Sequence, residues 1–515
     1  MPSTQLSNRI SAVISFVFGW TITCSAHAAV TLFPAQNGHD VNPDTHLVIT
    51  FPSAPTIGKS GQIRIYDAAD NKLVDTLDMS IPAGPAAGSV RGPAAPPTSR
   101  PYEYAAGHFT NANTKPGTPS GTAVATPDNY QLTIIGGFTD AFHFYPIIVH
   151  DNVATIYPHN NLLTYGKTYY VQVDPGVLSV ADDSFKGIGG QMGWTFTTKK
   201  SPPAANSPRV VVSLDGSADF NTVQGAVDFI PDHNPNRVTI FIKNGTYEEI
   251  VYFRNKSNIT FRGEDREKVI VGYANNEIFN PHPANVGTNE VPGTFPSRRA
   301  AFMVDHSTGI HLVNMSISNF TKGQAEGLLL VGGQHIVSNV TVTGSGDALQ
   351  VNDSAYFVDS TVIGDGDTLL SRGPVFFQNC TWKSRGAFMW MRNTSASHGA
   401  VCVNCKFEAV GPTPTVIARA PTNGSKNYPN VEVVLINCAL GNISPELFGP
   451  LGGDTTNMHF WEFNSTNLSD GKPADTSKRL AAVKQLDKDK DAETVANYSN
   501  PAYILGWTPK LDGEK

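Results

Sequence analysis

Residues 344–370 read GSGDALQVNDSAYFVDSTVIGDGDTLL and contain two versions of one short phrase. Asp347 is flanked by glycine and followed by Ala-Leu, and twenty residues later Asp367 follows a glycine and precedes Thr-Leu. Short apolar segments ending in Asn or Gly continue this spacing, among them HIVSNVTVTG, AYFVDSTVIG and VFFQNCTWKS. Such a repeat is typical of a parallel β-helix, in which each coil stacks on the one before.

The repeat predicts which side chains lie next to each other. Asp347 and Asp367 occupy equivalent positions in successive coils. Stacked strands lie about 4.8 Å apart, so the two carboxylates should face each other across roughly that distance. A simple turn in which each aspartate bonds its local backbone would also repeat with the coils. The next coil has Ala387 at this place, so the turn itself does not require an aspartate.

A pair of carboxylates at this distance favours acyl-transfer chemistry. Both cannot ionise without a large repulsion, so we expect one to stay protonated near neutral pH while the other remains an anion. The anion can attack an acyl carbon if a neighbouring group orients it and another stabilises the oxyanion.

A second set of equivalent positions lies at the strand ends, and we call it a ladder. It contains Asn339, Asp359 and Asn379, each twenty residues from the next. Three of the four cysteines beyond residue 28 directly follow an asparagine, which places them in the same coils. We interpret them as small buried side chains stacked in successive coils, while a disulfide remains open in an export compartment. These cysteines are Cys380, Cys402, Cys405 and Cys438.

The composition agrees with an all-β chain. Its 515 residues exceed one ordinary compact domain, and charged residues make up only 16% while Gly and Pro number 46 and 36. That balance favours short strands and turns over long helices. The net charge of −7, without a basic run, excludes nucleic acid as the expected partner. A neutral or esterified polymer would not be repelled by this charge.

The N-terminus has the pattern of a secretory signal over residues 1–28. Arg9 precedes an apolar run from Ile10 to Trp20, and Ala26-His27-Ala28 fits a cleavage site. The run is shorter than a membrane span, so we expect a secreted or periplasmic protein with no membrane insertion after signal removal.

Two domains are expected after the signal. Residues 29–198 contain short strand-like segments such as HLVITF, GQIRIYD and KTYYVQV, and they resemble an immunoglobulin-like β-sandwich with a long loop at 82–128. Residues 199–208 are a Pro- and Ala-rich linker, and 209–515 form the β-helix.

One short helix is expected early in the second domain. Phe220, Val223, Val227 and Ile230 have helical spacing, and Ser217 and Asp219 are the capping candidates. Such a helix would cap one end of the β-helix and hide its exposed strand edges.

Several segments in a fixed order carry a family resemblance. LDGSADFNTVQGAVDFIP, FIKNGTYEE, NITFRGE, GQAEGLLL, GSGDALQ, GDGDTLL and IARAP resemble the successive signature blocks of pectin methylesterases, over about residues 209–510. The resemblance implies a right-handed parallel β-helix and hydrolysis of the C6 methyl esters of pectin without a metal or other cofactor. The expected partner is therefore methylated pectin or another cell-wall polysaccharide, and we expect a monomer.

The resemblance also implies roles for single residues. Asp367 matches the family's nucleophile and Asp347 its general acid and base. Gln324 matches the glutamine that stabilises the oxyanion, and Arg419 matches the arginine that orients the nucleophile. Trp390 is a candidate for stacking against a substrate sugar.

Three departures from the family pattern leave the substrate open. Gly346 stands where the family has a second oxyanion glutamine, residues 368–371 read TLLS instead of an aromatic segment, and Pro421 replaces a cleft tryptophan. An acyl thioesterase or other esterase on the same scaffold is one alternative. A non-catalytic β-helix that binds polysaccharide is another. A calcium-dependent lyase is disfavoured because no cluster of calcium-binding carboxylates is evident.

Overall fold

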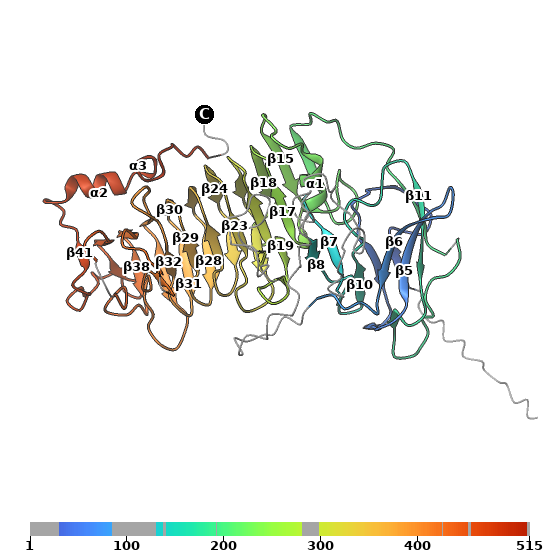
Figure 1. The fold of residues 1–515 in the computed structure, drawn as a ribbon, viewed down its shortest axis with the longest axis horizontal. Helices are drawn as coiled ribbons and strands as arrows, with labels where there is room; N and C mark the ends of the chain where they lie inside the picture. Colours follow the sequence, from blue (N-terminus) through green and yellow to red (C-terminus); the bar gives the residue numbers. More distant parts are fainter. Residues whose placement is uncertain are drawn as a thin grey trace, which may run out of the picture.

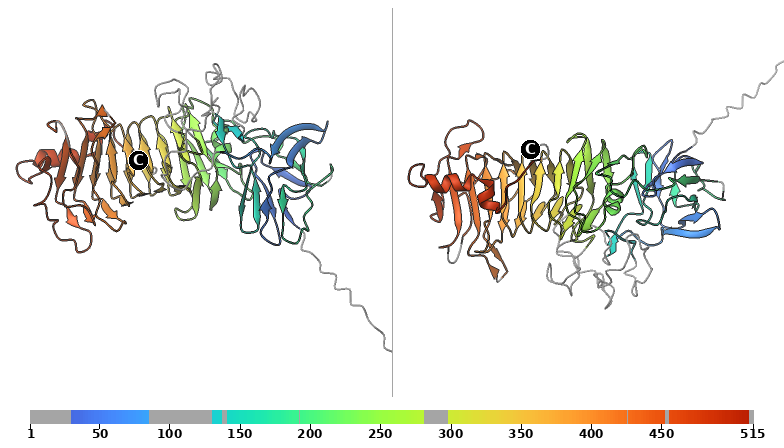
Figure 2. Two further views of the ribbon diagram at one scale, coloured as in Figure 1. Left: turned by 60° about the horizontal axis from the view of Figure 1, so that its bottom comes forward. Right: turned by 90° about the horizontal axis from the view of Figure 1, so that it is seen from above.

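A computed structural model describes residues 30–84, 130–136, 141–191, 193–280, 298–424, 426–451 and 455–511. The predicted signal at residues 1–28 and most of the predicted loop at 82–128 lie outside these ranges. Figure 1 shows an elongated molecule with a β-sandwich at one end and a long stack of parallel strands extending from it. In both views of Figure 2 the sandwich continues the long axis of this stack.

The stack is a parallel β-helix with three faces. Within the described residues, its strands form sheets of eleven, nine and six strands, here called the first, second and third sheet. The first sheet contains β14 (Arg209–Val212), β15 (Val238–Ile242), β18 (Ile259–Gly263), β21 (His311–Val313), β24 (His335–Ser338), β27 (Ala355–Val358), β30 (Val375–Gln378), β33 (Ala400–Val403), β37 (Glu432–Ile436), β39 (His459–Phe463) and β41 (Val483–Gln485).

The other two sheets complete each coil. The second sheet contains β16 (Gly245–Glu248), β19 (Val269–Tyr273), β22 (Ser316–Asn319), β25 (Thr341–Thr343), β28 (Thr361–Gly364), β31 (Thr381–Ser384), β34 (Lys406–Ala409), β38 (Ala439–Gly441) and β40 (Thr466–Asn467). The third sheet contains β17 (Val251–Arg254), β20 (Phe302–Asp305), β23 (Leu328–Leu330), β26 (Leu349–Val351), β29 (Leu369–Ser371) and β32 (Met389–Met391). A short antiparallel pair, β35 (Thr422–Asn423) and β36 (Lys426–Asn427), projects after the last of these strands.

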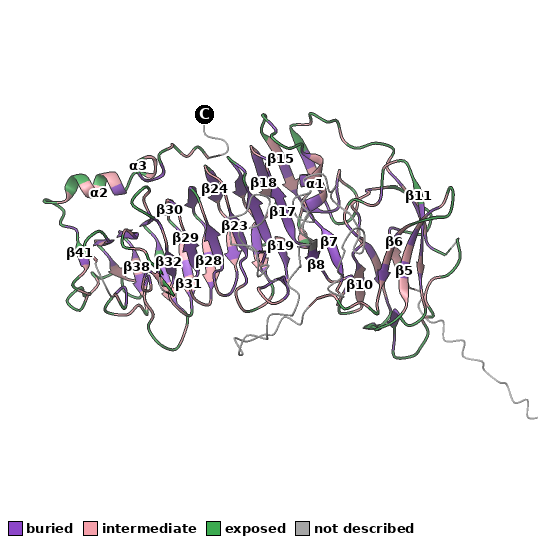
Figure 3. Ribbon diagram, in the orientation of Figure 1, coloured by how far each residue is buried: buried purple, intermediate pink, exposed green. Residues whose placement is uncertain are grey.

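Inward-facing Val, Ile, Leu and Phe side chains from all three sheets form one continuous buried cluster along the axis. Figure 3 shows the strands as buried and the connecting loops as largely exposed or intermediate. Burial of these apolar side chains is the main force that stacks the coils. The prediction of an all-β chain dominated by a parallel β-helix is confirmed.

The strand register confirms the equivalent positions expected from the repeat. β26 pairs with β29 so that Leu349 lies beside Leu369, which aligns Asp347 with Asp367. The next pairing aligns Leu369 with Met389 and hence Asp367 with Ala387.

The ladder at the strand ends has one shared backbone conformation. Asn339, Asp359 and Asn379 have φ values of 53°, 50° and 54°, in the left-handed region. Asn and Asp tolerate this region better than other side chains with a Cβ. The periodic asparagines therefore mark the corner between the first and second sheets.

The four cysteines among the described residues are free and buried. The register of the second sheet places Cys380, Cys405 and Cys438 in successive coils. The Cys405 Sγ lies 3.5 Å from the Phe377 carbonyl oxygen, and the Cys438 Sγ lies 3.4 Å from that of Cys402. The interpretation as stacked small side chains is confirmed, and none of these four forms a disulfide.

The expected helix is present, but its cap differs from the prediction. α1 (Val223–Phe229) begins after Thr222, whose side chain accepts from the Gly225 N–H at 2.9 Å. The predicted caps Ser217 and Asp219 are therefore wrong, because the helix begins later and Asp219 instead accepts from the Val211 N–H.

The N-terminal region is a β-sandwich with its own buried core. One sheet contains β1 (Thr31–Phe33), β3 (Leu47–Thr50), β10 (Val153–Ile156) and β9 (Ile147–His150), and the other contains β2 (Gly38–Val41), β13 (Thr195–Thr198), β11 (Thr168–Val173), β5 (Gln62–Asp67) and β6 (Lys72–Asp78). Two small pairs join β12 (Leu178–Ser179) to β4 (Thr56–Ile57) and β7 (Leu132–Ile134) to β8 (Ala141–His143). The immunoglobulin-like type and the domain boundaries stay predictions.

The sandwich packs closely against the first coils. Asp44 accepts hydrogen bonds from the Asn221 N–H at 2.9 Å and from the Thr222 N–H at 2.8 Å, next to α1. A Cβ on Gly225 would lie 2.4 Å from the Asp44 carboxylate, so this contact requires glycine inside the helix. Beside it, Phe142 of the sandwich joins an apolar cluster with Tyr252 and other residues of the β-helix.

Two further helices, α2 (Ala492–Tyr498) and α3 (Pro501–Leu505), lie along the first sheet. The Tyr498 hydroxyl donates to Glu432 at 2.7 Å, and Trp507 donates to Ser354 at 3.1 Å. The segment therefore runs back along the stack. Across the described ranges, no helix has both the length and the apolar character needed to cross a membrane.

Candidate active site

Three stacked backbone positions define the candidate site beside the third sheet. Parallel bridges join Gln324 to Gly346 and Gly346 to Gly366. These bridges lie immediately before β23, β26 and β29, so successive coils bring Gln324, Asp347 and Asp367 onto one face. The repeated phrase in the sequence thus places the two aspartates at aligned positions of neighbouring coils.

Both aspartates have left-handed backbone torsions, with φ of 56° at Asp347 and 44° at Asp367. Aspartate tolerates this conformation, which would cost most other L residues roughly 1–2 kcal/mol. The backbone turns sharply at each of these residues. The exposed fraction differs between them, at 19% for the Asp367 side chain and 4% for that of Asp347. Asp367 is therefore the more accessible of the two carboxylates.

Arg419 pairs with Asp367. Its Nε lies 2.8 Å from Oδ1 and 3.0 Å from Oδ2. The Arg419 N–H donates to the Met389 carbonyl at 3.1 Å, which fixes this segment beside β32. The ion pair orients the carboxylate by charge-assisted hydrogen bonds, as a nucleophile requires.

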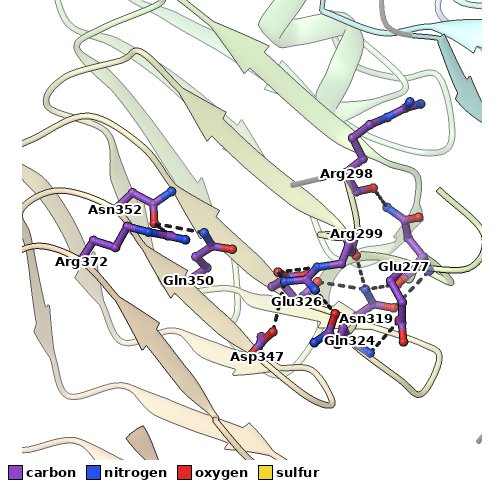
Figure 4. A network of polar contacts seen from close by, with 11 residues as sticks. Glu277, Arg298, Arg299, Asn319, Gln324, Glu326, Asp347, Gln350, Asn352 and Arg372 are labelled. Atoms are coloured by element: carbon purple, nitrogen blue, oxygen red, sulfur yellow. Dashed lines mark hydrogen bonds and ion pairs between the residues drawn. The ribbon is translucent and has the colours of Figure 1, made fainter. Parts of the chain in front are cut away.

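A second arginine, Arg299, pairs with Asp347 and was not expected from the sequence. Figure 4 shows its guanidinium between Gln324, Glu326 and Asp347. One Nη donates to the Asp347 Oδ2 at 3.1 Å, and the other donates to the Gln324 Oε1. The Nε donates to both oxygens of Glu326, at 2.9 and 3.0 Å. Each aspartate therefore has its own arginine.

The Glu326 side chain is completely buried. Burial raises the pKa of Glu326, and the charge of Arg299 opposes that rise. Burial lowers the pKa of Arg299, but the charges of Glu326 and Asp347 more than offset it and leave it above its ordinary value. Arg299 is thus a permanent cation in the site.

Glu277 holds the backbone of the glutamine segment. Its carboxylate accepts from the Gln324 N–H at 2.7 Å, and its own N–H donates to the Gln324 carbonyl at 3.2 Å. These bonds fix the loop that precedes β23, so the Gln324 side chain starts from a defined backbone position.

The ring of Trp390 stacks against the guanidinium groups of two arginines. The guanidinium of Arg419 is 3.9 Å from the centre of its ring and that of Arg392 is 3.6 Å away. Only 7% of Trp390 is exposed. Its contact with the site runs through these guanidinium groups, which it orients by cation–π attraction.

The surroundings of the carboxylates are cationic. Arg372 donates to the Asn352 Oδ1 at 2.6 Å, and its pKa is lowered to about 10 by burial and by the charge of Arg392. A positive rim of this kind attracts anionic groups despite the net negative charge of the chain.

The structure therefore brings together all four residues expected to do the chemistry, with Trp390 beneath Arg419. Sequence reasoning missed Arg299 and Glu326. The signal was the single carboxylate in GQAEGLLL, because a glutamate among buried apolar residues needs a buried cation.

The arrangement has the parts that acyl transfer to a carboxylate requires. It combines an accessible aspartate paired with a cation, a second aspartate one coil away, and a side-chain amide on the same face.

The chain is similar in sequence to known proteins. The family model described as Pectinesterase matches residues 209–439. Probable pectinesterase 30 of Arabidopsis thaliana is 24% identical over 302 residues, which cover 56% of this chain and 58% of that protein. A pectinesterase of Ralstonia solanacearum is 28% identical over 321 residues, which cover 50% of this chain and 79% of that protein.

The pectin methylesterase from carrot matches with a TM-score of 0.47 and 20% identity, covering 60% of this chain and 95% of that one. The chain spans 58% and 51% of the lengths of two Arabidopsis relatives that it matches. By the family model over residues 209–439 and by these curated relatives, the β-helical part of this chain is similar to pectinesterases.

Proposed function

We propose that this protein is an exported pectinesterase that hydrolyses the C6 methyl esters of homogalacturonan and releases methanol. The observation that carries the proposal is the stack of Gln324, Asp347 and Asp367 in three successive coils, with Arg419 bound to Asp367. The pectinesterase relatives support the substrate class. The predicted signal at residues 1–28 supports export.

The geometry supports a covalent mechanism. A carboxylate oxygen of Asp367 would attack the C6 carbonyl carbon while the Gln324 amide donates to the developing oxyanion. The methoxide would leave as methanol with a proton from Asp347, and the acyl group would remain on Asp367 as an anhydride. Asp347 would then take a proton from water, whose hydroxide attacks the acyl carbon and frees Asp367 and the product carboxylate.

Trp390 contributes to substrate binding in this proposal through the arginines on its ring. Arg392 and Arg419 would meet carboxylates or ring oxygens of a galacturonate chain, while Trp390 keeps their planes fixed.

The test is methanol release from highly methylated homogalacturonan by the wild type and by Asp367→Asn. Asparagine keeps the size and the tolerance for the left-handed backbone but removes the nucleophile. We expect release to fall roughly 1,000-fold or more. Asp359→Asn is the matched control, because Asp359 is left-handed in the same coil and its equivalents Asn339 and Asn379 are asparagines.

Two results would contradict the proposal. Equal release by wild type and Asp367→Asn would remove Asp367 from the reaction. No release by a folded wild type across pH 5 to 9 would reject methylated pectin as the substrate, and turnover of an acyl thioester instead would select the thioesterase alternative.

A further inference from the structure

The site has no side-chain donor at Gly346, the position that stacks on Gln324 in the next coil. Gly346 has no side chain, and its backbone N–H already donates to the Gly323 carbonyl at 2.8 Å. A Cβ on Gly346 would lie 3.0 Å from that carbonyl oxygen, which is tighter than ordinary contact. Gly346 therefore contributes no hydrogen bond to an oxyanion, and the Gln324 amide carries more of that task.

An amide alone does not have a fixed donor end. The two ends of a glutamine side chain have nearly the same shape, and rotation by 180° exchanges the donor NH₂ and the acceptor oxygen. An oxyanion is stabilised only when the NH₂ faces the reacting carbon. Some neighbouring group has to exclude the reversed orientation.

We propose that Arg299 is a positioning residue that fixes the Gln324 amide as a hydrogen-bond donor and holds Asp347 beside it. The Gln324 amide can then act as the oxyanion donor although Gly346 provides no second one. The inference rests on the proposed esterase function.

The argument for the amide is chemical. A guanidinium has donors only, so the atom of Gln324 that it contacts must be the oxygen. One Arg299 Nη donates to that oxygen. The reversed amide would place its NH₂ group against the arginine N–H, so the hydrogen bond would be lost and the two donors would repel each other. The Gln324 Nε2 is thereby directed away from Arg299.

The argument for Asp347 is geometric. The same guanidinium donates to the Asp347 Oδ2 at 3.1 Å, and this carboxylate is almost fully buried. One planar group thus sets the relative positions of the oxyanion donor and the proposed acid and base. Figure 4 shows both contacts from the one guanidinium.

Glu326 makes the guanidinium rigid. Its buried carboxylate bonds to the Arg299 Nε at 2.9 Å and to one Nη at 2.5 Å, a two-point contact that leaves no rotation about the last bonds of the arginine. The remaining Nη is therefore held toward Gln324.

The experiment measures kcat and KM for methanol release in four proteins: wild type, Arg299→Lys, Gln324→Ala and the double variant. Lysine keeps the charge but cannot bond Glu326, Gln324 and Asp347 at once. We expect Arg299→Lys to lower kcat roughly 30-fold or more with KM within about threefold. In the Gln324→Ala background the same change should lower kcat by a smaller factor than in the wild type, because the amide that it positions is gone and only the contact with Asp347 is lost.

Folding is controlled in two ways. The variant Arg299→Met/Glu326→Leu removes the buried pair together, so that no unpaired carboxylate remains in the core. It should show the same loss in kcat. Arg266→Lys is the matched control, since Arg266 also bonds three side chains, Thr341, Asn339 and Thr361, but lies in the turn between β18 and β19, away from the site.

The outcomes separate the two proposals. A wild type without activity would reject the esterase function and the inference with it. An active wild type, together with equal losses for Arg299→Lys in both backgrounds, would overturn the positioning of the Gln324 amide, and a change confined to KM would overturn both positioning tasks; either result would leave the esterase function intact.

Discussion

The aspartates of the site are left-handed residues, and this decides which substitutions are informative. At Asp347 and Asp367 an alanine would remove the carboxylate and also strain the backbone by roughly 1–2 kcal/mol. Asparagine removes only the charge. The sequence could predict these two positions because they repeat at the period of the coil, and Gln324 and Arg419 because they lie in recognisable blocks. Arg299 lies 48 residues before Asp347 in a segment without periodicity. Only the stacking of distant coils brings it into the site.

At the residue scale, Arg419→Lys should lower kcat. The Arg419 Nε contacts both oxygens of Asp367 while its plane lies on Trp390, and a lysine has neither the planar group nor this donor. Losing such charge-assisted bonds costs about 1.5–3 kcal/mol, so we expect a decrease of roughly 10- to 100-fold. Steady-state kinetics of methanol release measures it.

The control for this change is Arg479→Lys. Arg479 pairs with Glu462 through two bonds of 2.9 Å, far along the stack from the site, and this pair is more deeply buried than that of Arg419 and Asp367. Its substitution should lower stability while kcat stays at the wild-type value. An Arg419→Lys variant with wild-type kcat would contradict the orienting role.

At the scale of elements, each coil depends on its strands and also on the left-handed residue at the corner between the first and second sheets. Apolar periodicity predicted the strands, and the recurring Asn and Asp predicted which residues would align. The start of α1 was misplaced because its cap depends on a partner from another domain: the Thr222 hydroxyl both accepts from the Gly225 N–H and donates to Asp44. No local pattern contains that contact.

The ladder of left-handed corners predicts a specific stability difference. Asn379→Ala should lower the free energy of unfolding by about 1–2 kcal/mol, because alanine is strained at φ of 54°. Asn379→Gly loses the same side-chain contacts with Asp359 and Asn404 but avoids this strain. Chemical denaturation of the two variants compares them directly. Equal stabilities, or a more stable alanine variant, would show that the corner is not held in the left-handed region.

At the scale of the whole molecule, the sandwich and the β-helix share buried polar contacts. The chain could be divided into two regions from composition and strand pattern, but their contact could not be predicted, because it depends on single residues such as Asp44 and Gly225. Burial raises the pKa of Asp44 to about 6, even though hydrogen bonds from Thr222 and Asn221 oppose this rise.

This raised pKa predicts a pH dependence for the joined molecule. The folded state binds the Asp44 proton more tightly than the unfolded state, so its stabilising contribution is complete below about pH 4 and is lost as the pH rises through about 6. The rise of the Asp44 pKa from 3.8 to about 6 corresponds to roughly 3 kcal/mol in the free energy of unfolding. Asp44→Asn keeps acceptors for the same N–H groups but does not titrate. Thermal melts of both proteins from pH 4 to 7 should show a steeper decline for the wild type, and parallel profiles would contradict it.

The stacked cysteines have a consequence for observing this protein. Burial raises the pKa of the Cys402 and Cys405 thiols, and all four thiols of the described coils lie in the core. Thiolates react with alkylating reagents, so each of these groups becomes reactive only when its coil opens. Mass spectrometry of each peptide measures the rate of alkylation. This rate therefore reports the opening of individual coils in the native chain, without an engineered cysteine or other introduced probe.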